Sequence, residues 1–120
     1  MTQLTRQEAF DKALFGIRAQ NYEQSMNGSI CAYRGRNGNK CAIGHCIDDI
    51  TAQAWDIANG ATEIQNIANI DREGFERYFS LGNVAFLSEL QVVHDASEMS
   101  SQSFEEGMCV LADTYVLHYA

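Results

Sequence analysis

Apolar residues recur at helical spacing near the start of the chain. Thr5 and Glu8 stand three residues apart, as in a helix capping box, and apolar positions then follow from Phe10 to Ile17. The polar residues between them fall on the opposite side of a helix. This pattern predicts a helix from about Thr5 to about Gln24.

A second set of apolar stripes lies in the last third of the chain. One stripe runs from Phe86 to Val93, and another continues from Phe104 to Tyr119 after a second capping-box pair, Ser103 and Glu106. A short serine-rich connection separates the two stripes. Two amphipathic helices packed as an antiparallel hairpin are therefore expected here.

The middle of the chain predicts shorter elements. A helix should begin near Asp48, where several side chains can cap it, and end before Gly60. A further short helix is expected within Asp71–Leu81. The segment Ala61–Ile70 is consistent with either a loop or a short helix, and its role stays open.

One segment has strand-like rather than helical character. Ser29–Arg34 and Lys40–Ile43 flank a turn-forming stretch in which Asn37 and Gly38 both tolerate positive φ. This pattern predicts a β-hairpin. The expected fold is thus α+β and mainly α, with about four to five helices packed around one short hairpin in a single domain spanning residues 1–120.

Composition supports a folded domain and limits its partners. The chain has 120 residues, of which 46% are hydrophobic, and it contains no proline. Its apolar runs are all shorter than the roughly 18 residues of a membrane span, and residues 1–10 lack the features of a signal peptide. We therefore expect a cytoplasmic protein without a membrane partner.

The net charge of −8 is unevenly distributed. No lysine or arginine follows Arg77, whereas six acidic residues do. Such a chain is unsuited to non-specific nucleic-acid binding, which depends on basic side chains. The acidic residues form either a solvated face or a surface for a basic partner protein. The candidate partner-surface residues are Glu89, Asp95, Glu98, Glu105, Glu106 and Asp113.

Cations and a histidine gather around the predicted turn. Arg34, Arg36, Lys40 and His45 are the candidate ligand-binding residues, because guanidinium groups and backbone N–H groups suit phosphate or carboxylate. A nucleotide or another small phosphorylated ligand is one interpretation. A solvated basic turn is the other.

The same segment holds most of the thiols. Cys31, Cys41, Cys46 and His94 have acceptable side chains for a zinc site, with His45 as the alternative histidine, and no other cofactor is expected. The spacing of Cys41 and Cys46 lies at the edge of the usual range and a second tight pair is missing, so buried apolar cysteines are the alternative. Cys46 with His94 as its base would be a candidate thiol nucleophile, but His94 also fits the pattern of a core histidine.

Two blocks of sequence resemble a family of small uncharacterised phage and bacterial proteins. The first is Cys31–His45, read as CAYRGRNGNKCAIGH, and the second is Leu90–Asp95, read as LQVVHD. In that family the first block usually continues as Leu-Ile-Pro-Asp, whereas this chain has Cys46-Ile-Asp-Asp49. The difference argues against Cys46 as a shared catalytic residue.

The resemblance implies a role but no mechanism. Small acidic phage-type proteins are often stoichiometric inhibitors or sequestering factors that act on a host component, such as a defence system, in the host cytoplasm. No complete catalytic constellation is visible in the sequence, so we expect a binding protein rather than an enzyme. A protein that binds a phosphorylated ligand and a small thiol- or metal-dependent enzyme remain the alternatives.

Overall fold

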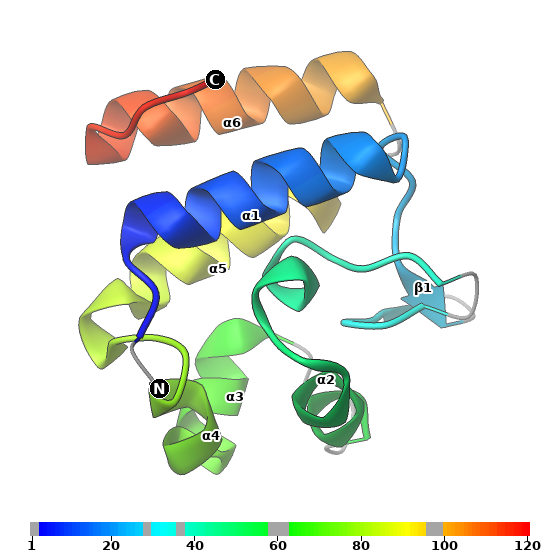
Figure 1. Ribbon diagram of the computed structural model, residues 1–120, viewed down its shortest axis with the longest axis vertical. Helices are drawn as coiled ribbons and strands as arrows, with labels where there is room; N and C mark the ends of the chain where they lie inside the picture. The colour runs from blue at the N-terminus through cyan, green and yellow to red at the C-terminus, as the bar shows by residue number, and fades with distance from the viewer. Residues whose placement is uncertain (1–2, 28–29, 36–37, 58–62, 96–99) are drawn as a thin grey trace.

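The computed structural model describes residues 3–27, 30–35, 38–57, 63–95 and 100–120, and this part of the chain is mainly helical (Figure 1). It contains six α-helices, two short 3₁₀ helices and one pair of two-residue strands. In chain order the elements are α1 (Arg6–Ala19), β1 (Met26–Asn27), β2 (Ile30–Cys31), η1 (Ile43–Cys46), α2 (Asp49–Asp56), α3 (Ile64–Ile70), α4 (Arg72–Glu76), η2 (Leu81–Asn83), α5 (Val84–Asp95) and α6 (Ser101–Tyr115).

Helix α5 lies at the centre of the arrangement. It packs against α3, α6 and both 3₁₀ helices. Helices α1, α5 and α6 lie together on one side of the molecule, with α2, α3 and α4 on the other (Figure 1). The described part of the chain has no helix long and apolar enough to cross a membrane.

The capping box predicted at the start of α1 is present. The Thr5 hydroxyl accepts a hydrogen bond from the Glu8 N–H at 3.1 Å, and Glu8 accepts one from the Thr5 N–H at 2.8 Å. The helix ends at Ala19, earlier than the sequence indicated. Asn21 and Tyr22 adopt left-handed φ values of 57° and 63°, which a helix cannot continue through.

Helices α5 and α6 form the predicted antiparallel hairpin. Val93 lies against Gly107, and Glu89 lies against Tyr115 at the other end of the pair. The predicted capping box at Ser103 is wrong: α6 begins earlier, at Ser101, with the hydroxyl of Ser100 accepting a hydrogen bond from the Ser103 N–H.

The shorter helices in the middle are fixed by side chains at their first turns. Asp48 caps α2 and Asp71 caps α4. Most of the ambiguous Ala61–Ile70 segment forms α3, whose first N–H, at Ile64, bonds to the buried side chain of Gln91 on α5 at 2.9 Å. Residues 58–62 lie outside the described part.

The predicted β-hairpin is wrong, and with it the α+β fold class. Strand β2 (Ile30–Cys31) pairs antiparallel with β1 (Met26–Asn27), which precedes it in the chain, and not with residues after the predicted turn. The second predicted strand, Lys40–Ile43, is followed directly by η1, which begins at Ile43. Among the described residues, the two predicted strands are joined by one isolated antiparallel β-bridge, between Arg34 and Lys40. The physical reason is that carboxylate oxygens of Asp56, on α2, accept the backbone N–H groups of Tyr33 and Arg34 at 2.8 and 3.0 Å, the groups a facing strand would have bonded.

Candidate functional site

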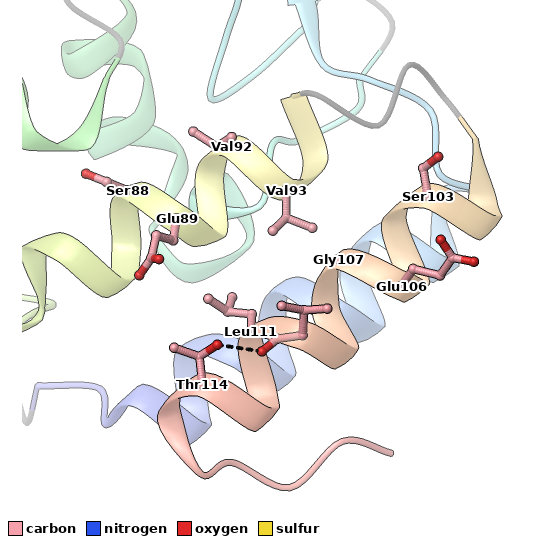
Figure 2. Close-up of a pocket in the computed structure, with 10 residues that line it drawn as sticks. Ser88, Glu89, Val92, Val93, Ser103, Glu106, Gly107, Leu111 and Thr114 are labelled. Atoms are coloured by element: carbon pink, nitrogen blue, oxygen red, sulfur yellow. Dashed lines mark hydrogen bonds between the residues drawn. The ribbon is translucent and has the colours of Figure 1, made fainter.

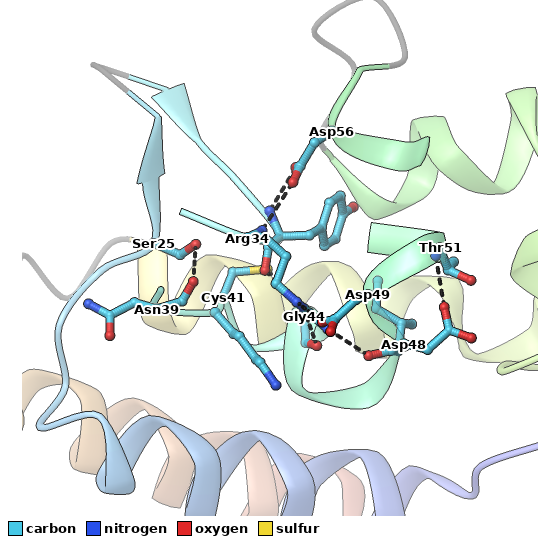
Figure 3. A network of polar contacts seen from close by, with 12 residues as sticks. Ser25, Arg34, Asn39, Cys41, Gly44, Asp48, Asp49, Thr51 and Asp56 are labelled. Carbon is cyan, nitrogen blue, oxygen red and sulfur yellow. Dashed lines mark hydrogen bonds and ion pairs between the residues drawn. The ribbon is translucent and has the colours of Figure 1, made fainter. Parts of the chain in front are cut away.

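Arg34, the first predicted anion ligand, is held by the protein itself (Figure 3). Its guanidinium forms an ion pair with Asp49 at 2.8 Å. It also donates to the carbonyl groups of Tyr33, Gly44 and Ile47 at 3.1, 2.7 and 2.9 Å. Because these bonds occupy most of the donors of one guanidinium, Arg34 joins η1 to α2 and has little capacity left for an anion.

Two of the other predicted anion ligands, Lys40 and His45, are connected through the side chain of Gln20. Arg36 lies outside the described part. The backbone of Lys40 exchanges two hydrogen bonds with the Gln20 side chain, at 3.1 and 2.7 Å, and the same Gln20 oxygen lies 3.0 Å from Nε2 of His45. Burial, together with the charges of Lys40 and Arg34, lowers the pKa of His45 to about 4. His45 is therefore neutral at physiological pH and adds no charge for an anion.

The described cysteines of the predicted zinc set are buried. The Cys41 sulfur accepts a hydrogen bond from the Gly44 N–H at 3.3 Å, and Cys46 lies 3.6 Å from the carbonyl oxygen of Ala9. Burial raises the pKa of both thiols, to about 12 for Cys46. The side chain of Cys31 lies outside the described part, and among described residues no group of three or more histidine, cysteine or acidic side chains could hold a metal ion.

The high thiol pKa values also bear on the nucleophile hypothesis. A thiol with a pKa of about 12 is protonated at neutral pH, whereas the attacking species is the thiolate. His94 is fully buried on α5, with its ring packed edge-on against Phe104 at 5.8 Å between centroids. Burial lowers its pKa, and the backbone of Tyr22 and Glu23 opposes that shift. These features match a core histidine.

Glu105, one of the predicted partner-surface residues, joins α6 to α1. Its carboxylate accepts two hydrogen bonds from Arg18, at 2.8 and 2.7 Å, one from Tyr22 at 3.0 Å and one from Tyr119. The hydrogen bonds from Arg18 are the main reason that the pKa of Glu105 falls to about 2. This carboxylate is therefore committed to internal contacts.

The remaining acidic residues divide into two groups. Asp95 is partly buried at the end of α5, and Glu98 lies outside the described part. Glu89, Glu106 and Asp113 are exposed on α5 and α6. Three of the six predicted partner-surface residues thus share the outer face of this helix pair.

An apolar groove runs between α5 and α6 on that face (Figure 2). It has a volume of about 640 Å³, and α1 lies behind α6 as the groove is seen in Figure 2. Val92 and Val110 form its exposed apolar surface, with 59% and 64% of each residue accessible to solvent. The lining residues are Ser88, Glu89, Val92, Val93, Ser103, Glu106, Gly107, Val110, Leu111 and Thr114.

Gly107 explains how closely the two helices approach each other. A Cβ atom placed on Gly107 would lie 2.8 Å from Cγ1 of Val93, closer than two carbon atoms pack. The floor of the groove therefore consists of Val93, the bare backbone at Gly107 and Leu111. The exposed valines stand beside this floor.

Acidic side chains lie at the margins of the groove. Glu89 lies toward one end and Glu106 toward the other (Figure 2). Tyr115 donates a hydrogen bond to Glu89, and Gln102 donates one to Glu106 at 3.0 Å, so α6 helps to orient both carboxylates. Asp113 follows Glu106 by seven residues, which places it two turns along the same face of α6.

The sequence contains signals of the groove that lie outside the two predicted apolar stripes. Val92 lies off the buried stripe of α5. Val110 falls off the buried stripe of α6, and Gly107 interrupts an otherwise favourable helix sequence. Together these three anomalies mark the face that the structure leaves apolar.

Comparison with known proteins finds no matching family model, no similar curated protein and no similar solved structure.

Proposed function

We propose that this chain is a stoichiometric binding protein that engages a basic partner protein through the groove between α5 and α6. The observation that carries the proposal is the groove itself. It is a concave, mainly apolar groove with a volume of about 640 Å³, two exposed valines and acidic side chains at its margins. A concave apolar patch with a polar rim is typical of a protein-interaction site.

Charge supports a basic partner. The charged residues that line the groove are both acidic, Glu89 and Glu106. Glu89 and Glu106 are held in place by side chains of α6, which reduces the entropy lost when they pair with a cation. A partner with apolar side chains surrounded by lysine or arginine would match this surface.

Inhibition or sequestration of a host component is the narrower form of the proposal. The resemblance to small phage and bacterial proteins supports it, because a small binding domain acts by covering a surface of its target. The alternatives are less well supported, since Arg34 is held by internal hydrogen bonds and the Cys46 thiol is protonated.

Affinity purification with three baits tests the proposal. Wild-type chain, Val110→Glu and Ile50→Glu would each be used to capture proteins from an extract of the natural host cell. Ile50 is 82% exposed on α2, so its change to glutamate is a matched control outside the groove. Native mass spectrometry of the eluates then gives the identity and stoichiometry of any complex.

The expected result is a near-equimolar complex with wild type and Ile50→Glu, and at least about tenfold less of it with Val110→Glu, a loss of about 1.4 kcal/mol. A complex that survives Val110→Glu, or that Ile50→Glu abolishes, would show that another surface binds. Wild-type chain that elutes without a protein but with a nucleotide or a zinc ion would favour the alternatives.

A further inference from the structure

The surface of the groove has the relief of a helix-packing site. On α6, Ser103, Gly107 and Leu111 follow each other at intervals of four residues and form a low row, because the first two side chains are small or absent. Glu106, Val110 and Thr114 form the neighbouring row at the same spacing, and it stands higher. Rows at this spacing are the ridges and furrows into which another helix packs.

The groove offers contacts for side chains but not for an extended backbone. Both of its walls are α-helices, whose backbone N–H and C=O groups are bonded within each helix. A peptide that binds as an added strand needs a free strand edge, which these walls lack. A helix brings its own backbone hydrogen bonds and needs apolar side chains to fill the furrow.

The dimensions agree with a helix of about three turns. From Ser103 to Thr114 the lining residues of α6 span about 16 Å at 1.5 Å per residue. Helix α1 already packs on the other side of the α5/α6 pair, joined to α6 through Arg18 and Glu105. A helix in the groove would convert this arrangement into a four-helix packing.

Charge discriminates between possible helices. A second copy of this chain carries a net charge of −8, and its own acidic residues would meet Glu89 and Glu106. Lysine or arginine beside the apolar positions of the bound helix would instead pair with these carboxylates.

On these grounds we infer that the occupant of the groove is a cationic amphipathic helix of the partner protein. It has apolar residues at positions i, i+3 or i+4, and i+7 that contact Val92, Val110 and Val93, which fills the space over Gly107. Basic residues on its flanks pair with Glu89 and Glu106. This inference rests on the proposed function and adds the chemistry and conformation of the partner segment.

A displayed library of random peptides of about 16 residues provides the test, since such peptides reach about 24 Å as helices and can overhang both ends of the groove. Selection on immobilised wild-type chain, with counter-selection on Val110→Glu, isolates binders that need the groove. Enriched peptides are then synthesised, titrated into wild type, Val110→Glu and Ile50→Glu, and followed by circular dichroism for helix formation.

The inference predicts enriched peptides with helical apolar spacing and flanking lysine or arginine, which gain helix on binding and lose at least about tenfold affinity with Val110→Glu but not with Ile50→Glu. Groove-dependent peptides that are extended, proline-rich or acidic would overturn it, as would a selection without groove-dependent binders.

The affinity purification distinguishes a wrong inference about the occupant of the groove from a wrong proposal about the function of the groove. If the captured host protein needs Val110 while the selected peptides are not cationic helices, the groove is the binding site and the inference about its occupant is wrong. If neither the host protein nor any peptide needs Val110, both are wrong.

Discussion

The substitution Glu105→Gln tests whether this carboxylate fastens α6 to α1 or is part of a partner surface. Glu105 accepts hydrogen bonds from Arg18, Tyr22 and Tyr119, and those from Arg18 are the main cause of the fall in its pKa from 4.5 to about 2. Glutamine retains the size of the side chain but removes its charge. The variant should therefore fold and be less stable.

The shift in pKa sets the magnitude. At about 1.36 kcal/mol per tenfold change in acid dissociation constant, a pKa lowered from 4.5 to about 2 corresponds to an upper limit of about 3 kcal/mol. The Glu105 side chain is 23% exposed, so solvent screening reduces the expected contribution. We expect Glu105→Gln to lower the free energy of unfolding by about 2 kcal/mol at neutral pH.

Equilibrium urea unfolding of both proteins over a range of pH is the assay. Because the folded-state pKa lies below the unfolded-state value, the stabilisation is fully present above about pH 4.5 and is lost as the pH falls through about 2. The difference between wild type and Glu105→Gln should shrink over this interval. Glu106→Gln is the matched control on the next residue and should change stability by less than about 0.5 kcal/mol. Equal stability of wild type and Glu105→Gln at neutral pH, or a difference that does not depend on pH, would refute the reasoning.

Three further changes test the packing around η1. Gly16→Ala should lower the free energy of unfolding by about 1–3 kcal/mol, because the added Cβ would lie 2.3 Å from Nδ1 of His45. In a His45→Ala background this loss of stability should largely disappear. A loss that persists there would show that the His45 ring is not its cause. Arg34→Lys should lower the free energy of unfolding, measured in urea, by about 2–3 kcal/mol, because an ammonium cannot reproduce the guanidinium hydrogen bonds to Asp49 and to the carbonyl groups around η1. A change below about 0.5 kcal/mol would contradict this structural role. Burial, reinforced by the charges of Lys40 and Arg34, lowers the pKa of His45 to about 4. Wild type should therefore lose stability as the pH falls from about 6.5 through about 4, and His45→Asn should flatten that part of the stability profile. An imidazole pKa at or above about 6.5, measured by NMR, would contradict this pH dependence.

The helices could be predicted from sequence because their determinants are local. The capping box of Thr5 and Glu8 and the buried stripe of α6 depend on residues within a few positions of each other. Boundaries were less predictable: α1 ends at Ala19 because Asn21 and Tyr22 both adopt left-handed φ values. Asparagine adopts this conformation readily, but a tyrosine rarely does, so the turn could not be inferred from both residues.

The predicted hairpin failed because distant side chains replace the missing strand. Asp56 accepts the backbone N–H groups of Tyr33 and Arg34, and Gln20 pairs with the backbone of Lys40. Pairings across such distances in sequence cannot be inferred from the propensities of the segment itself.

The candidate site could be predicted only in part. The acidic residues after Arg77 lie in the part of the chain that also forms the groove, and Glu89, Glu106 and Asp113 are exposed on α5 and α6. Composition could not distinguish these residues from Glu105, which is held by Arg18, because that difference depends on the packing of α1 against α6.

Methyl NMR of the valines tests most directly whether a partner binds in the groove. The chain has five valines, of which Val92, Val93 and Val110 line the groove while Val84 and Val116 do not. With methyl-labelled chain bound to the captured host protein, saturation of the partner's protons should transfer to the methyl groups of Val92 and Val110. Val116, which is 91% exposed, should be unaffected and so controls for non-specific contact. Transfer to Val116 without transfer to Val92 and Val110, or no transfer to any valine in a stable complex, would contradict the assignment of the groove as the binding site.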